Sequence, residues 1–212
     1  LSLENLTTEE QKAVVLAAQG SGELLQQGEV AAAEGKINQA VSLAPQSAYA
    51  GVAKVLLLMA SREDELARKE LDRVFELDAE YAPAWALLGD LENRNKNLAK
   101  AEVAYSKAME NRANNLPDIL KRAQVRIILK KYEAAQKDID PLKKRIPQNA
   151  TVNYAQGLIY FQGNRLREAK DDFNLALSAN DRLLQAMFYL SLTNLRLGNW
   201  DRAEYYANQF HA

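Results

Sequence analysis

The chain has 212 residues, 48% of them hydrophobic and 26% charged, so it is long enough to bury a large core. Its net charge is −1 and the charges are interspersed, which leaves no electrostatic footprint for nucleic acid or an anionic membrane. Disulfides and cysteine-based metal sites are excluded because there is no cysteine, and His211 is the only histidine. We therefore expect no metal and no cofactor.

Alanine recurs every 34 residues along the chain. The alanines in phase are Ala33, Ala67, Ala101, Ala135, Ala169 and Ala203. Apolar residues tend to follow four and seven places later, as Tyr105 and Ala108 follow Ala101. A constant period of this length is typical of a repeat protein, and the four- and seven-residue steps are helical.

Residues 1–13 are expected to extend the first helix, and a single superhelix is expected over residues 14–212. Its repeats, numbered 1 to 6 in chain order, are 14–47, 48–81, 82–115, 116–149, 150–183 and 184–212. Each repeat contains two amphipathic stretches of about 14 residues, a common helix length, around a polar turn. The sequence therefore predicts an all-α, right-handed solenoid of six 34-residue helix-turn-helix units.

Turn and capping residues separate the predicted helices. Turns within repeats are expected at Gly28–Glu29, Arg62–Glu63, Lys96–Asn97, Lys130–Lys131, Gly163–Asn164 and Gly198–Asn199. Between repeats, segments such as "LAPQS" and "IPQNA" supply helix stops and N-caps. No long stretch alternates apolar and polar residues, so strands are not expected.

The small residues allow the two helices of a repeat to approach closely. We expect the in-phase alanine of each second helix to lie beneath a small residue of the first helix, with Gly89 and Gly157 as such partners. One helix pair cannot bury its apolar face alone, so the pairs should stack into a continuous core.

Repeat 3 has the most specific pattern. Its key residues are Trp85, Leu88, Gly89, Ala101, Tyr105 and Ala108. This pattern resembles the tetratricopeptide repeat family, from which Glu92 and Ala113 depart where the family usually has Tyr and Pro. The resemblance covers residues 14–212 and is weakest in repeat 1. It implies a helical solenoid that binds proteins.

The last 80 or so residues show a narrower resemblance. Residues 137–180 and 197–210 are similar to the tetratricopeptide lipoproteins of exosortase and exopolysaccharide systems. That resemblance implies the bacterial cell envelope or periplasm, with the cytoplasm as the alternative. Such proteins are held by a lipidated cysteine, which this sequence lacks, and the sequence reads as a fragment of a longer protein. No direct membrane insertion is expected, because there is no long apolar run.

Reactive chemistry has little support. The carboxylates of Asp171–Asp172 and Glu63–Glu65 could form an acid/base pair or a metal site, but such runs usually form the solvated face of a helix. The glycines between residues 20 and 35 lack the order of a phosphate-binding loop. His211 lies near the terminus, where chain ends tend to fray. The protein is therefore not expected to be an enzyme.

The first helix of every repeat should face the inner wall of the superhelix and line a groove. The expected partner-binding residues are Val52, Leu56, Met59, Asp90, Arg94, Leu120, Gln124, Ile127, Tyr154, Leu158, Phe161, Phe188, Leu192 and Leu195. Those from Tyr154 onward should form one apolar strip. The Lys and Asn by which related domains hold chaperone carboxylates do not occur at the fifth and ninth places of the repeats.

Two functions remain open. The first is a scaffold that binds a protein or peptide segment in the groove, which an apolar stripe favours. The second is a structural spacer or self-assembly element of a longer repeat array, in which the groove is incidental and some of its side chains simply pack between neighbouring first helices. Repeat ends could then join copies into a homo-oligomer. Nucleic acid is not an expected partner.

Overall fold

Capping residues start several of the helices. The side chains of Ser47, Asn115 and Asn149 accept hydrogen bonds from backbone amides in the first turn of the helix that follows. At the start of the first helix, Thr7 and Glu10 cap each other, because each side chain accepts a hydrogen bond from the other's backbone amide. The bond from the Thr7 amide lowers the pKa of Glu10.

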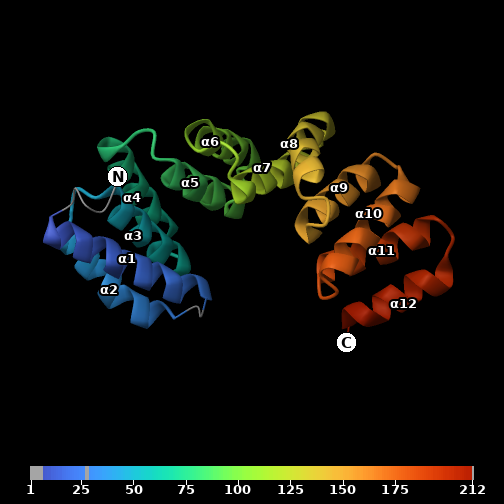
Figure 1. Ribbon diagram of the computed structural model, residues 1–212, viewed down its shortest axis with the longest axis horizontal. Helices are drawn as coiled ribbons and strands as arrows, with labels where there is room; N and C mark the ends of the chain where they lie inside the picture. The colour runs from blue at the N-terminus through green and yellow to red at the C-terminus, as the bar shows by residue number, and fades with distance from the viewer. Residues whose placement is uncertain (1–6, 27–28, 212) are drawn as a thin grey trace. The chain divides into compact units, whose positions relative to one another are not determined.

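The computed structural model describes residues 7–26 and 29–211, without the side chains of residues 210 and 211, and forms two compact units, 1–113 and 114–212. Unit 1 contains α1 (Thr8–Gln26), α2 (Val30–Leu43), α3 (Ala48–Ala60), α4 (Asp64–Leu77), α5 (Ala82–Arg94) and α6 (Leu98–Asn111) (Figure 1). Unit 2 contains α7 (Leu116–Ile128), α8 (Tyr132–Arg145), α9 (Ala150–Gln162), α10 (Leu166–Ala179), α11 (Leu184–Arg196) and α12 (Trp200–His211). These residues include no strand, so the predicted all-α repeat fold is confirmed.

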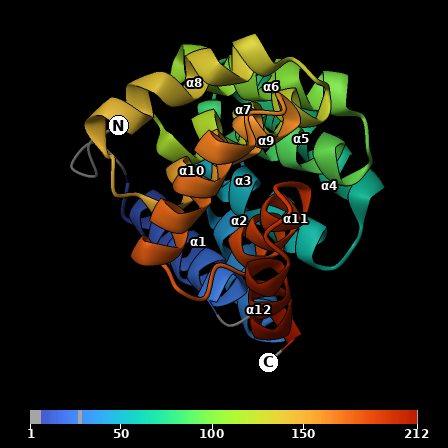
Figure 2. The ribbon, with the colours of Figure 1, turned by 90° about the vertical axis from the view of Figure 1, so that its right-hand side faces the viewer.

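Within each unit, helices pack in the order that a repeat array requires. The two helices of each repeat pack against each other, as α11 does against α12 in Figure 2. Within unit 2, first helices also contact first helices, α7 with α9 and α9 with α11. The described turns agree with the predicted ones to within a residue, whereas Gly28 lies outside the described residues.

The in-phase alanines are core residues. All six are buried, and five have no exposed surface. Four residues after Ala101 and Ala169 come Tyr105 and Phe173, which are among the largest fully buried side chains. The alanines therefore do lie in the contact between helices.

The predicted partners of Gly89 and Gly157 were wrong. A Cβ atom added to Gly89 would lie 2.5 Å from the ring of Tyr105, and one added to Gly157 would lie 2.6 Å from the ring of Phe173. The glycines thus make room for an aromatic ring on the second helix, because alanine is too short to fill that space. In repeat 4, Ile139 stands at the place that Phe173 has in repeat 5. Ala123 there stands at the place of Gly157.

The turn inside the repeats contains a residue with left-handed backbone. Arg62, Lys96, Lys130 and Asn164 have φ between 59° and 64°, and Gly198 has φ 78°. They are spaced by 34 residues. Side chains with a Cβ destabilise this conformation, so the cost recurs from repeat to repeat.

Lys96→Gly and Lys130→Gly should each raise the free energy of unfolding by about 0.5–1 kcal/mol. Relief of the left-handed strain outweighs the extra entropy that glycine has in the unfolded chain. Urea denaturation followed by circular dichroism measures the gain. Gly198→Ala is the control and should lower the free energy of unfolding. Unchanged urea midpoints for both lysine variants would show that the left-handed backbone does not destabilise these turns.

The runs of carboxylates are only partly solvated, contrary to the prediction. Asp171 is exposed, but Asp172 is buried and forms an ion pair with Lys143. Burial raises the pKa of Asp172, and the hydrogen bond from Lys143 opposes that shift. Asp64 similarly accepts a hydrogen bond from Arg94. Charge pattern alone did not reveal these partners, which come from neighbouring repeats.

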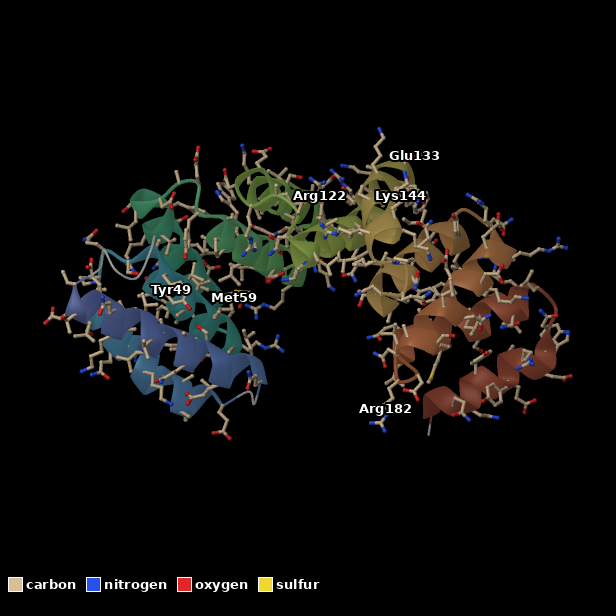
Figure 3. The ribbon with its side chains drawn as sticks, viewed as in Figure 1. Tyr49, Met59, Arg122, Glu133, Lys144 and Arg182 are labelled. Carbon is tan, nitrogen blue, oxygen red and sulfur yellow. The ribbon has the colours of Figure 1, made fainter. Side chains whose placement is uncertain are left out.

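A buried ion cluster joins α7 and α8 in unit 2. Arg122, labelled in Figure 3, and Arg126 both donate to the carboxylate of Asp138, with N–O distances of 2.6 and 2.7 Å. The side chain of Asp138 is 4% exposed and those of the arginines 16%. The sequence pattern did not predict this cluster.

Candidate functional site

A pocket of about 640 Å³ opens on unit 2, lined mainly by the first helices of its three repeats. Gln124 and Ile127 line it from α7, Tyr154 and Leu158 from α9, and Tyr189 from α11. The first four of these residues were predicted to bind a partner. The structure therefore brings them together, because α7, α9 and α11 pack in succession.

The pocket combines apolar walls with uncharged hydrogen-bonding groups. Among the described residues that line it, Lys130 is the one charged side chain. Burial, with a smaller contribution from Tyr189, raises the pKa of Tyr154 to about 12. Its hydroxyl therefore stays protonated at neutral pH and can donate a hydrogen bond. The rings of Tyr154 and Tyr189 lie 6.1 Å apart, centroid to centroid.

The other predicted residues of unit 2 differ in exposure. Leu120 and Phe161 are buried, Leu192 is half-buried, and Phe188 and Leu195 are exposed. Phe161 is covered by Tyr189, with centroids 5.4 Å apart, and by the guanidinium of Arg196. The predicted strip is thus exposed at its end in repeat 6, while much of its surface in repeat 5 contacts the next helix.

In unit 1 the predicted residues take part in internal packing. Partly buried against the core of α3, α4 and α5 are Val52, Leu56 and Met59, the last labelled on α3 in Figure 3. Asp90 accepts a hydrogen bond of 2.8 Å from the hydroxyl of Tyr105. Arg94 donates one of 2.8 Å to the carbonyl of Met59. These contacts match the alternative in which such side chains join neighbouring helices.

Two important pocket residues are not among those predicted from the sequence. Tyr189 stands at the sixth place of repeat 6 and Ile128 at the thirteenth place of repeat 4, whereas the prediction counted the fifth, ninth and twelfth places and used the thirteenth only at Arg94. Each directly follows a predicted residue, Phe188 or Ile127. A wider helical stripe would have included them.

A second pocket, of about 920 Å³, lies in unit 1 near helix ends. Tyr49 and Tyr81 line it together with Glu10 and Asp78. Burial is the main cause that raises the pKa of Tyr81. This pocket contains none of the residues predicted to bind a partner.

Metal-ligating clusters and membrane-spanning helices were sought among the described residues. They include no group of three or more His, Asp or Glu placed to hold a metal ion. Among the helices described, none combines the length and the apolar character needed to cross a bilayer.

Comparison with known proteins gives one family. The family model described as "Tetratricopeptide repeat" matches residues 52–115 and 154–210, more than half of the chain. No curated protein matches the sequence significantly.

Solved structures share the fold. PilF of Pseudomonas aeruginosa is 16% identical with a TM-score of 0.79, over 96% of this chain and 92% of its own. PilW, a type IV pilus biogenesis factor, is 15% identical with a TM-score of 0.80, over 93% and 92%. YrrB, described as having an unusual peptide-binding site, is 17% identical with a TM-score of 0.65, over 82% and 90%. At these identities the likeness concerns the fold alone.

Proposed function

The chain belongs to the tetratricopeptide repeat family, and from this premise we propose that it is a non-catalytic scaffold that binds a partner segment in the pocket of unit 2. Proteins of this family are generally interaction scaffolds. The partner is a protein or peptide segment with apolar side chains.

The composition of the pocket supports this proposal. Ile127 and Leu158 provide apolar wall, Tyr154 provides a protonated hydroxyl, and Ile128 is 60% exposed beside them. Exposed apolar side chains around a cavity are the usual anchors of a partner, and a few of them typically dominate binding. The lack of acidic residues among the described lining favours an apolar rather than a basic segment.

Ile128→Asp should weaken peptide binding at least tenfold, because it places a charge at the apolar rim of the pocket. The probe is a set of 12-residue peptides selected by display against the wild-type chain, and affinity is measured by fluorescence anisotropy. Ile128 is exposed, so its replacement should leave the thermal midpoint nearly unchanged.

Val103→Asp is the matched control. Val103 is also 60% exposed, but it lies on α6 in unit 1 and should not affect these peptides. The proposal that the peptides bind in this pocket would be contradicted by either of two results. One is equal peptide affinity of the wild type and Ile128→Asp, and the other is an equal loss of affinity in Ile128→Asp and Val103→Asp.

One observation favours a spacer or self-assembly element as the second candidate function. Phe188 and Leu195 occupy in repeat 6 the places of Tyr154 and Phe161, yet they are 43% and 44% exposed. In repeat 5 those places contact Tyr189 of the next helix. Another helix could cover them in the same way. Solution scattering decides this, because assembly predicts a mass that rises with concentration.

A bacterial envelope exopolysaccharide system is the more specific setting that we propose. Its support is the sequence resemblance of residues 137–180 and 197–210. Fractionation of cells expressing the full-length protein tests it, and recovery in the cytosolic fraction alone would overturn it.

A further inference from the structure

A second, smaller pocket of unit 2 has a basic character. It has a volume of about 450 Å³ and lies between α10, α11 and α12. Its lining is Lys170 and Asn174 from α10, Asn194 from α11, Arg202 and Tyr206 from α12, and Asn199 just before α12. The lining contains two cations, three amides and a phenol, and no carboxylate among the described residues.

The equivalent residues three repeats earlier in the chain hold a carboxylate. Three periods of 34 residues, 102 in all, separate each pocket residue from its equivalent. The pairs are Lys170 with Arg68, Asn194 with Glu92, Asn199 with Asn97, and Arg202 with Lys100. The buried carboxylate of Glu92 accepts from Arg68 at 2.8 Å and from the Asn97 amide at 2.8 Å. Burial by itself raises the pKa of Glu92, but these two groups and the charge of Lys100 outweigh burial and lower it.

In repeat 6 the carboxylate is replaced but the cations remain. Asn194 stands in place of Glu92, and Asn174 in place of Asp72. The acidic neighbours in sequence, Asp171 and Asp201, are exposed and do not line the pocket. Lys170 and Arg202 have no carboxylate partner within the part of the chain that the structure describes. Their two charges are therefore not compensated inside the pocket.

Two hydrogen bonds hold the side chain of Asn194 in this pocket. The Asn194 side chain is buried, and its amide donates to the Leu190 carbonyl at 2.8 Å. Asn199 donates to the Asn194 side-chain oxygen at 3.3 Å, a longer bond than Asn97 makes with Glu92. An asparagine is one methylene shorter than a glutamate. The space that a carboxylate occupies in repeat 3 is thus part of a cavity in repeat 6.

We propose that this pocket binds the carboxylate of an acidic side chain from a partner protein, held by Lys170, Arg202 and Asn199. The carboxylate would take the position that Glu92 occupies in repeat 3 and restore the missing charge. This site does not depend on the apolar pocket of α7, α9 and α11. The site also differs from the places at which related domains hold chaperone carboxylates, the fifth and ninth of a repeat. Its four principal residues stand at the eleventh (Asn194), sixteenth (Asn199), nineteenth (Arg202) and twenty-first (Lys170) places.

The test is a titration followed by the side-chain amide NMR signals of Asn194 and Asn199. The probes are an acetylated, amidated Ala-Glu-Ala peptide, its Ala-Gln-Ala counterpart, an acetylated trialanine with a free C-terminus, and inorganic phosphate. Ionic strength is held constant with chloride. We expect a saturable shift with the glutamate peptide and at least tenfold weaker binding of the other three.

Two variants and a control complete the experiment. Lys170→Met should weaken the glutamate peptide at least tenfold, and Asn194→Glu should abolish its binding because the chain then supplies its own carboxylate. Lys137→Met, which removes an exposed cation of α8, should change nothing. The proposal is overturned by an unaltered response in Lys170→Met, or by a response to phosphate or the free C-terminus alone.

Discussion

Asp138→Ala is expected to lower the free energy of unfolding by about 3 kcal/mol, because Arg122 and Arg126 then lose the carboxylate that both contact. The arginines would keep their charges in a site where 16% of each side chain is exposed. Removing one partner of a buried pair costs more than the pair itself contributes, since the remaining charges stay poorly solvated. Urea denaturation at neutral pH measures this loss.

Glu133→Ala provides the matched control on the same helix. Glu133 is exposed, so its removal should change the free energy of unfolding by less than about 0.5 kcal/mol. Asp138→Asn keeps the shape and should fall between the two. If Asp138→Ala behaved like Glu133→Ala, the cluster would have no part in holding α7 to α8.

Gly157→Ala should lower the free energy of unfolding by about 1–2 kcal/mol, although alanine favours a helix by about 1 kcal/mol. The added Cβ would lie 2.6 Å from two ring atoms of Phe173. That ring is fully buried and also contacts Tyr154 and Tyr189, so it cannot move aside freely. Overpacking therefore outweighs propensity here.

A double-mutant cycle tests the cause. In a Phe173→Ile background, Gly157→Ala should cost nothing, because Ala123 and Ile139 already occupy the same places in repeat 4. Gly22→Ala is the control, since a Cβ there meets nothing within 4 Å and should stabilise α1 by roughly 0.5–1 kcal/mol. If Gly157→Ala were equally costly in the Phe173→Ile background, the ring contact would be excluded as the origin of the cost.

Part of the candidate site was predictable and part was not. Helical spacing placed Gln124, Ile127, Tyr154 and Leu158 on one face, and all four line one pocket. It did not reveal that Tyr189 covers Phe161, because that contact depends on how α11 packs on α9. Exposure is a property of the neighbouring helix as much as of the residue itself.

The sequence by itself determined the helices and their pairing. A 34-residue period with buried alanines specifies where each pair meets, and Pro, Asn and Ser specify where helices begin, because these are local effects of backbone geometry and capping. Only the tertiary structure decided which charges are compensated. Glu92 and Asn194 share a place in the repeat, yet one is held by Arg68 and the other lies in a pocket whose described lining has cations but no carboxylate. Such pairing depends on side chains from different helices, which a reading of one helix face does not include.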